Sequence, residues 1–134
     1  MVGDRVQLSA SLARSEIVVT EGGLLEIGSS TLVNFGTSIV ATGRITIGPN
    51  CLIGTHCFII DTGFHELDPD RRLEVPAPCP VTIGRNVWLG ARVIVMPGVT
   101  IGDDSAIAAG SVVTSDVPPR CLAAGVPARV IREL

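Results

Sequence analysis

The chain has 134 residues, of which 46% are hydrophobic and 3% aromatic, and its ten basic and thirteen acidic side chains leave a formal net charge of -3. This length predicts a single domain, residues 1–134. The acidic balance argues against a nucleic-acid-binding protein. No apolar run approaches the roughly 18 residues of a membrane-spanning helix, so we expect no membrane span.

The first residues, MVGDRVQLSA, have neither the cationic start nor the continuous apolar stretch of a secretory signal. We therefore expect a cytoplasmic protein. The four cysteines show no C-x-x-C spacing, which argues against a zinc ribbon or a thioredoxin-like motif. Reduced thiols are the default for such a protein.

A six-residue repeat begins in the first third of the chain. Its unit is an aliphatic residue, often followed by glycine, with a small or β-branched residue four positions after the aliphatic one. The upstream aliphatic positions are Ile27, Val33, Ile39, Ile47, Ile53 and Ile59. Cys51 and Cys57 occupy small positions of this pattern, so we expect both thiols to point inward and fill the core.

The repeat stops at Ile60 and resumes at Val81, and the segment between them, DTGFHELDPDRRLEVPAPCP, is rich in Pro, Asp and Arg. A polar insertion in a regular scaffold is a frequent location of functional residues. We expect residues 61–80 to form a protruding loop. Its one histidine, His65, carries an imidazole, the side chain group best suited to general-base catalysis near neutral pH. The loop position alone also fits a solvated histidine without a function.

After the loop the repeat runs without a slip. The aliphatic positions are Ile83, Leu89, Val95, Ile101, Ile107 and Val113. Six residues suit a short strand and a tight turn, and three such units make a triangular coil of 18 residues. Coils of this kind stack about 4.8 Å apart through parallel strand pairing. The sequence therefore predicts an all-β parallel β-helix of about five 18-residue coils, with a tail over residues 118–134 that adds one more strand (CLAAG) and a short last element (RVIREL).

Residues 81–134 contain the strings VTIGRNVWLG, PGVTIGD, GSVVTSDVPP and AAGVPARVIRE. Together they closely resemble the C-terminal half of hexapeptide-repeat acetyltransferases, among them the maltose, galactoside and nodulation-factor enzymes and small acetyltransferases of polysaccharide biosynthesis. The resemblance covers about residues 24–134. It implies a left-handed helix, which spacing alone does not show, a homotrimer with active sites between subunits, acetyl-CoA as co-substrate and a sugar-type acceptor.

The resemblance also implies roles for individual residues. The string DTGFHELDP matches the family's catalytic loop, so His65 is implied as the general base, with Asp61 orienting the imidazole, binding the acceptor or only starting a turn. Asn34 and Trp88 match acceptor-side positions. His56 is expected to be exposed. Positions implied to contact CoA are Gly90, Ala91, Ala109, Gly110, Thr114, Arg129 and Arg132.

Two features differ from the maltose and galactoside enzymes. The chain starts almost at the first coil, without their preceding helical segment, and Ala41 and Thr42 stand where the galactoside enzymes have acidic residues. We therefore expect a small polysaccharide or nucleotide-sugar acetyltransferase and not a copy of those enzymes. The sequence does not separate O- from N-acetylation. Two alternatives to an acetyltransferase are a non-catalytic β-helix scaffold and a γ-type carbonic anhydrase. The second needs three histidine ligands for zinc, whereas this chain has two histidines.

Overall fold

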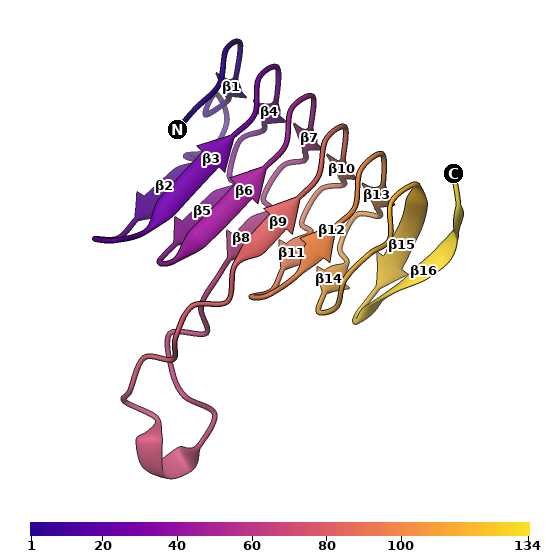
Figure 1. The fold of residues 1–134 in the computed structure, drawn as a ribbon. Coiled ribbons are helices and arrows are strands. Elements are labelled where there is room, and N and C mark those ends of the chain that lie inside the picture. The colour runs from indigo at the N-terminus through magenta and orange to yellow at the C-terminus, as the bar shows by residue number, and fades with distance from the viewer.

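A computed structural model describes residues 1–134. The chain winds into a parallel β-solenoid of about five coils, as Figure 1 shows, and its one helical element is a single 3-10 turn, Pro69–Arg71. The predicted all-β parallel β-helix is confirmed. None of its helices has the length and apolar character to cross a membrane.

The strands form three sheets, which we name faces A, B and C and which the chain visits in the order B, C, A in each coil. Face A contains β3 (Leu24–Ile27), β6 (Arg44–Ile47), β9 (Val81–Ile83) and β12 (Thr100–Ile101). Face B contains β1 (Gln7–Leu8), β4 (Leu32–Val33), β7 (Leu52–Ile53), β10 (Trp88–Leu89), β13 (Ala106–Ile107), β15 (Cys121–Gly125) and β16 (Ala128–Glu133). Face C contains β2 (Glu16–Val19), β5 (Ser38–Ala41), β8 (Phe58–Ile60), β11 (Ile94–Val95) and β14 (Val112–Val113).

The register of the strands gives the length of each coil. After the loop, Trp88 pairs with Ala106, eighteen positions later, as the hexads predict. Before the loop the coils are longer, since Leu32 pairs with Leu52, twenty positions later. The extra residues lie at corners such as Thr42–Gly43, between β5 and β6. The predicted 18-residue coil therefore holds only for the C-terminal half.

The core is a stack of aliphatic side chains from all three faces. The repeat's large positions are almost fully buried: Ile27, Val33, Ile39, Ile47, Ile53, Ile59, Ile83, Leu89, Val95, Ile101, Ile107 and Val113. The small positions near the corners are buried too, and their polar groups bond to carbonyl groups of the next coil. The hydroxyl of Thr31 donates to the Gly48 carbonyl at 2.9 Å, and that of Thr37 donates to the Gly54 carbonyl at 3.0 Å. These bonds satisfy polar groups that burial would otherwise leave without partners.

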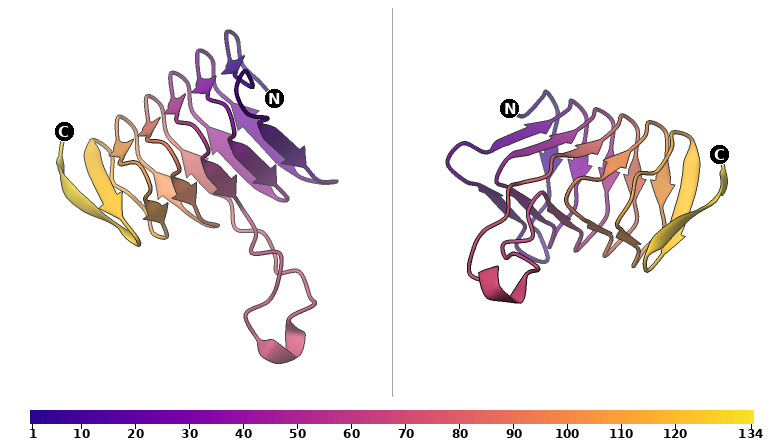
Figure 2. Two further views of the ribbon diagram at one scale, coloured as in Figure 1. Left: turned by 180° about the vertical axis from the view of Figure 1, so that it is seen from behind. Right: turned by 60° about the horizontal axis from the view of Figure 1, so that its bottom comes forward.

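The loop leaves the solenoid at the corner between faces C and A. β8 ends at Ile60 and β9 begins at Val81, so the predicted bounds of 61–80 are confirmed. In Figures 1 and 2 the loop projects well beyond the coils and carries the 3-10 turn at its far end. At the C-terminal end of the solenoid, the predicted strand CLAAG is β15, and β16 pairs with it in antiparallel orientation.

The four cysteines divide into three buried thiols and one exposed thiol, Cys79. Burial raises the pKa of the Cys51 and Cys57 thiols, and the Sγ atoms of both contact backbone carbonyl oxygens, those of Gly84 and Gly90. This confirms their predicted inward position. Because the folded-state pKa is raised, their contribution to stability is complete below about pH 9.0 and is lost as the pH rises through the folded-state value.

We predict that a thiol reagent at pH 8 modifies one cysteine of the native protein rapidly and the other three only after unfolding. The reason is that the reactive species is an accessible thiolate, and only Cys79 is exposed. Release of the chromophore from Ellman's reagent, with and without guanidinium chloride, measures this. A Cys79→Ser variant serves as the control and should show no rapid phase. Rapid modification of more than one thiol in the native wild-type chain would contradict the buried positions.

Candidate active site

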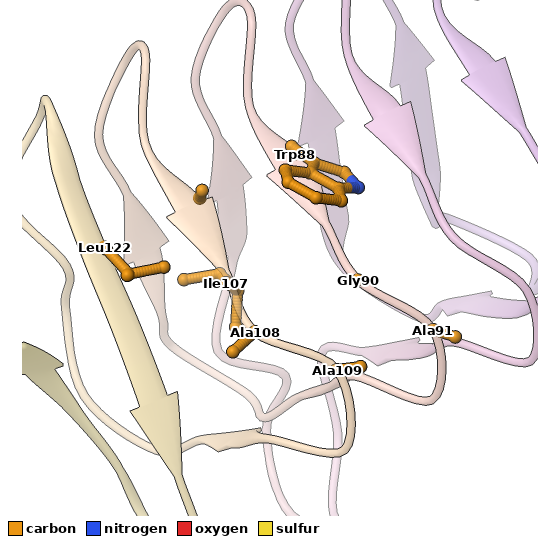
Figure 3. A pocket seen from close by; sticks show the side chains of 8 residues that line it. Trp88, Gly90, Ala91, Ile107, Ala108, Ala109 and Leu122 are labelled. Atoms are coloured by element: carbon orange, nitrogen blue, oxygen red, sulfur yellow. The ribbon is translucent and has the colours of Figure 1, made fainter. Parts of the chain in front are cut away.

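A hollow on face B contains several of the residues that the sequence implicated in CoA binding. It is lined by Trp88, Gly90, Ala91, Ala106, Ile107, Ala108, Ala109 and Leu122. Trp88 and Leu122 stand at opposite ends of this hollow, on β10 and β15, with β13 between them (Figure 3). The floor is made of small side chains and backbone, so an extended ligand can approach the main chain closely.

Two residues that line the face-B hollow have backbone N–H groups without a hydrogen-bond partner in the chain. The Gly90 N–H donates to the Ile107 carbonyl and the Gly110 N–H to the Ala91 carbonyl, each at 2.8 Å. The N–H groups of Ala91 and Ala109 have no partner within the chain. Of the four predicted CoA-contacting positions at this corner, Ala91 and Ala109 are therefore the ones whose amides are available. Gly90 contributes space instead, since a Cβ there would lie 2.6 Å from the Ala109 nitrogen.

Basic side chains lie at the C-terminal end of the same face. Arg132 is paired with Leu122 and Arg129 with Ala124 across the β15–β16 hairpin. Directly opposed residues of a sheet project from the same side, so Arg132 lies beside Leu122 on the outer surface of face B. The guanidinium groups of both arginines bond only to nearby backbone carbonyls, those of Ala128 and Glu133, and make no ion pair. They remain available to an anionic group at this end of the hollow.

His65 lies in a second hollow, where the loop meets the corner between faces C and A. The lining includes Thr62, Glu66, Cys79, Met96 and Pro97. The imidazole is exposed, and its Nδ1 atom is 2.8 Å from the carbonyl oxygen of Arg72. A carbonyl only accepts hydrogen bonds, so Nδ1 carries the proton in this contact. The neutral ring then has its lone pair on Nε2, which can act as a base.

The end of the loop is held together by its own contacts. The Glu66 N–H donates to the Glu74 carbonyl at 3.0 Å, and Arg72 Nη2 donates to the Leu67 carbonyl at 3.1 Å. Arg71 pairs with Glu74 at 2.6 Å, and this contact, with a smaller effect of Glu66, raises the pKa of the exposed Arg71 guanidinium. The segment around His65 is thus a compact unit.

Asp61 does not contact the His65 ring. Its side chain is fully buried at the base of the loop and accepts hydrogen bonds from Thr42 and Gly43. The prediction that Asp61 orients the imidazole by direct contact is therefore wrong. The hydrogen-bond partner of the ring is the carbonyl oxygen of Arg72. Burial also excludes the predicted contact of Asp61 with an acceptor in this conformation.

The remaining predicted residues lie at two different corners. Asn34 follows β4 at the corner between faces B and C, in the same column as Gly90, and its Oδ1 accepts from the Phe35 N–H at 2.9 Å. Thr114 follows β14 at the corner between faces C and A, two coils after the loop. His56 is exposed, as predicted, and its ring makes an edge contact with Phe35, 5.7 Å between centroids.

Within one chain, the structure thus assembles the predicted site as two separate halves. Trp88, Gly90, Ala91 and Ala109 line the face-B hollow, whereas His65 lines the hollow at the other edge of face C. The two hollows share no lining residue.

The known proteins that this chain resembles include several acetyltransferases. Residues 80–115 match the family described as bacterial transferase hexapeptide (six repeats), and residues 44–65 match the hexapeptide repeat of succinyl-transferase. A hexapeptide-repeat-containing acetyltransferase from Vibrio cholerae, solved in complex with acetyl coenzyme A, is 34% identical with a TM-score of 0.88, over 98% of this chain and 69% of that one. The chain belongs to the hexapeptide-repeat acetyltransferase family.

The chain is also similar to two galactoside acetyltransferases. Galactoside O-acetyltransferase of Escherichia coli is 47% identical over 116 residues, which cover 84% of this chain and 56% of that protein. A galactoside acetyltransferase solved in complex with coenzyme A is 43% identical with a TM-score of 0.83, over 96% of this chain and 64% of that one. This hexapeptide-repeat chain spans about half the length of the curated relatives it matches.

Among the residues that sequence reasoning missed in this acetyltransferase-family chain are Ala106 and Leu122 of the face-B hollow and Arg72 beside His65. Ala106 and Leu122 are paired in register with Trp88 along face B, so the repeat contained a signal for both of them. Arg72, whose carbonyl holds the His65 ring, lies in the non-periodic loop, and no sequence pattern indicated its role.

Proposed function

We propose that this chain transfers an acetyl group from acetyl-CoA to a hydroxyl, or amino, group of a sugar, nucleotide-sugar or polysaccharide precursor. The observation that carries the proposal is the His65 ring, held by Arg72 so that Nε2 is free, in a loop matching the family's catalytic segment. The relatives support it, since they include galactoside O-acetyltransferases and an acetyltransferase solved with acetyl-CoA.

His65 acts as the general base in a direct transfer. Nε2 accepts the proton of the acceptor hydroxyl while the hydroxyl oxygen attacks the thioester carbonyl carbon. The new C–O bond forms, the C–S bond breaks, and His65 returns the proton to the departing CoA thiolate. General-base assistance of this kind contributes roughly 10²- to 10⁴-fold to the rate. No acyl-enzyme is needed, because the two substrates react within one ternary complex.

The face-B hollow binds the donor in this proposal. The free N–H groups of Ala91 and Ala109 pair with carbonyl oxygens of the pantetheine arm, or hold the oxyanion that develops on the thioester. Trp88 covers the reactive end on the acceptor side. Arg129 and Arg132 receive phosphate groups at the C-terminal end, where a guanidinium fork makes paired charge-assisted bonds.

The active protein is proposed to be a homotrimer with its sites between subunits. The outer surface of face C is apolar at Phe58, Ile94 and Met96, and that of face B is apolar at Leu52 and Trp88, whereas face A carries polar side chains at Arg44, Thr46, Thr82 and Thr100. Two different apolar surfaces suit the head-to-tail contacts of a closed ring. Such contacts also bring the His65 hollow of one subunit toward the face-B hollow of the next.

A cytoplasmic location is part of the same proposal. The four cysteines are unpaired, as expected for thiols in a reducing compartment.

We predict that His65→Ala lowers kcat for acetyl transfer to a sugar acceptor by about 10²- to 10⁴-fold, because the proton acceptor is removed. The dissociation constant for acetyl-CoA should change less than twofold, since His65 lies outside the face-B hollow. A screen of sugar acceptors that detects the released thiol, together with calorimetry for the donor, measures both quantities.

His56→Asn is the matched control for the loss of a histidine, because asparagine tolerates the positive φ of 56° at this turn. It should retain wild-type kcat. Full activity of His65→Ala would exclude the general-base role. Absence of any acetyl-CoA affinity in the wild-type chain would favour a scaffold instead of an enzyme.

We also predict that Ala106→Phe weakens acetyl-CoA binding by at least about tenfold, because the ring fills the face-B hollow between Trp88 and Leu122. Thr82→Phe places the same ring on face A and should leave the affinity unchanged. Trp88 is the only tryptophan, so its fluorescence reports binding directly. Equal affinities of the two variants would place the donor elsewhere.

A further inference from the structure

A buried carboxylate holds the base of the loop that carries His65. Both oxygens of Asp61 are engaged by the preceding coil: the Thr42 N–H donates at 2.9 and 3.1 Å, the Thr42 hydroxyl at 2.8 Å and the Gly43 N–H at 2.8 Å. The Asp61 side chain has no exposed surface. A fully buried carboxylate with this number of donors strongly resists displacement, since its removal would leave buried N–H groups without partners.

The returning limb of the loop is tied to the same point. The Cys79 N–H donates to the Asp61 carbonyl at 2.7 Å, so one residue binds both limbs. The Pro78 ring lies directly against Gly43, where a Cβ would fall 2.6 Å from Pro78 Cγ and 2.7 Å from Pro78 Cβ. Gly43 has no positive φ, so it is the space under the proline ring, and not the backbone conformation, that requires glycine.

We infer that the Asp61 carboxylate and the Thr42–Gly43 backbone form a clamp that fixes the direction in which the loop leaves the solenoid, and that Asp61 is a positioning residue for His65. This inference rests on the proposed acetyl transfer. The loop end is a compact unit, so a change at its base moves the imidazole as part of that unit. A displacement of about 1 Å at a reacting group can lower the rate by about 10²-fold.

The clamp differs from the other carboxylates at the corners of the solenoid. Asp116 accepts from the Thr100 N–H at 2.7 Å and Asp103 from the Arg85 N–H at 2.9 Å, and both bonds lie at exposed positions. Neither carboxylate supports an inserted loop. Asp116 lies at the same corner as Asp61, two coils further along, and so provides a matched control.

The test compares Asp61→Asn, Gly43→Ala, Pro78→Ala and the double variant Gly43→Ala/Pro78→Ala, with Asp116→Asn as the control. Asp61→Asn replaces one of the two accepting oxygens by an NH2 group, which cannot accept a hydrogen bond from the backbone. Gly43→Ala pushes the proline ring away. Both should lower kcat by about 10- to 100-fold while KM for acetyl-CoA stays within twofold. Pro78→Ala and Asp116→Asn should stay within threefold of wild-type kcat.

The double variant decides whether Gly43 acts through Pro78. Removing the ring makes room for the alanine methyl group, so kcat should return to within about threefold of that of Pro78→Ala. Hydrogen exchange of the Thr42, Gly43 and Cys79 amides gives a readout independent of activity. It should be faster in Asp61→Asn and Gly43→Ala and return toward wild type in the double variant.

Three outcomes would overturn the inference. If amide hydrogen exchange at the base of the loop is faster in Asp61→Asn and Gly43→Ala while their kcat is unchanged, the clamp stabilises the fold without positioning His65. If the double variant stays as slow as Gly43→Ala, the proline contact is not the cause. If the wild-type chain binds acetyl-CoA but transfers no acetyl group to any acceptor, the proposed function fails and this inference fails with it.

Discussion

The in-register stacking of coils is the constraint on which the other features of the molecule depend. Each coil bonds to the next through parallel strand pairing, and each large inward side chain lies over its counterpart in the neighbouring coil, as Ile39, Ile59 and Val95 do on face C. A residue added within a strand would turn the inward side chains outward. Insertions are therefore tolerated only at corners, and this is where both the two-residue extensions and the long loop occur.

The same constraint separates the two halves of the proposed site. The strands of face B build a shallow surface of small residues, and the corner between faces C and A carries the long insertion with His65, the proposed base. A rigid three-sided scaffold cannot bend to bring these edges together. In the proposed trimer, acetyl transfer would depend on how neighbouring subunits pack and on how firmly the loop is held, and the buried Asp61 carboxylate would contribute to the second.

The sequence predicted the features that periodicity controls. The buried positions, the loop bounds at Ile60 and Val81 and the inward thiols of Cys51 and Cys57 follow from a six-residue pattern that the structure repeats. The loop itself has no period, so neither the contact of His65 with the Arg72 carbonyl nor the inward direction of Asp61 was foreseen. Asp61 follows a buried strand directly. Its side chain bonds to the Thr42–Gly43 corner, which is an extension of a coil that has twenty residues from Ser38 to Phe58 instead of eighteen.

The site between subunits can be tested by complementation. Two impaired variants, His65→Ala and Ala106→Phe, are co-expressed with different tags, and trimers that carry both tags are purified and assayed at an acetyl-CoA concentration below the KM of the wild-type chain. If His65 of one subunit serves the face-B hollow of its neighbour, every trimer that carries both variants has one of its three sites with both halves intact, and about a third of wild-type activity should return. Mixed trimers no more active than either variant alone would contradict a site shared between subunits.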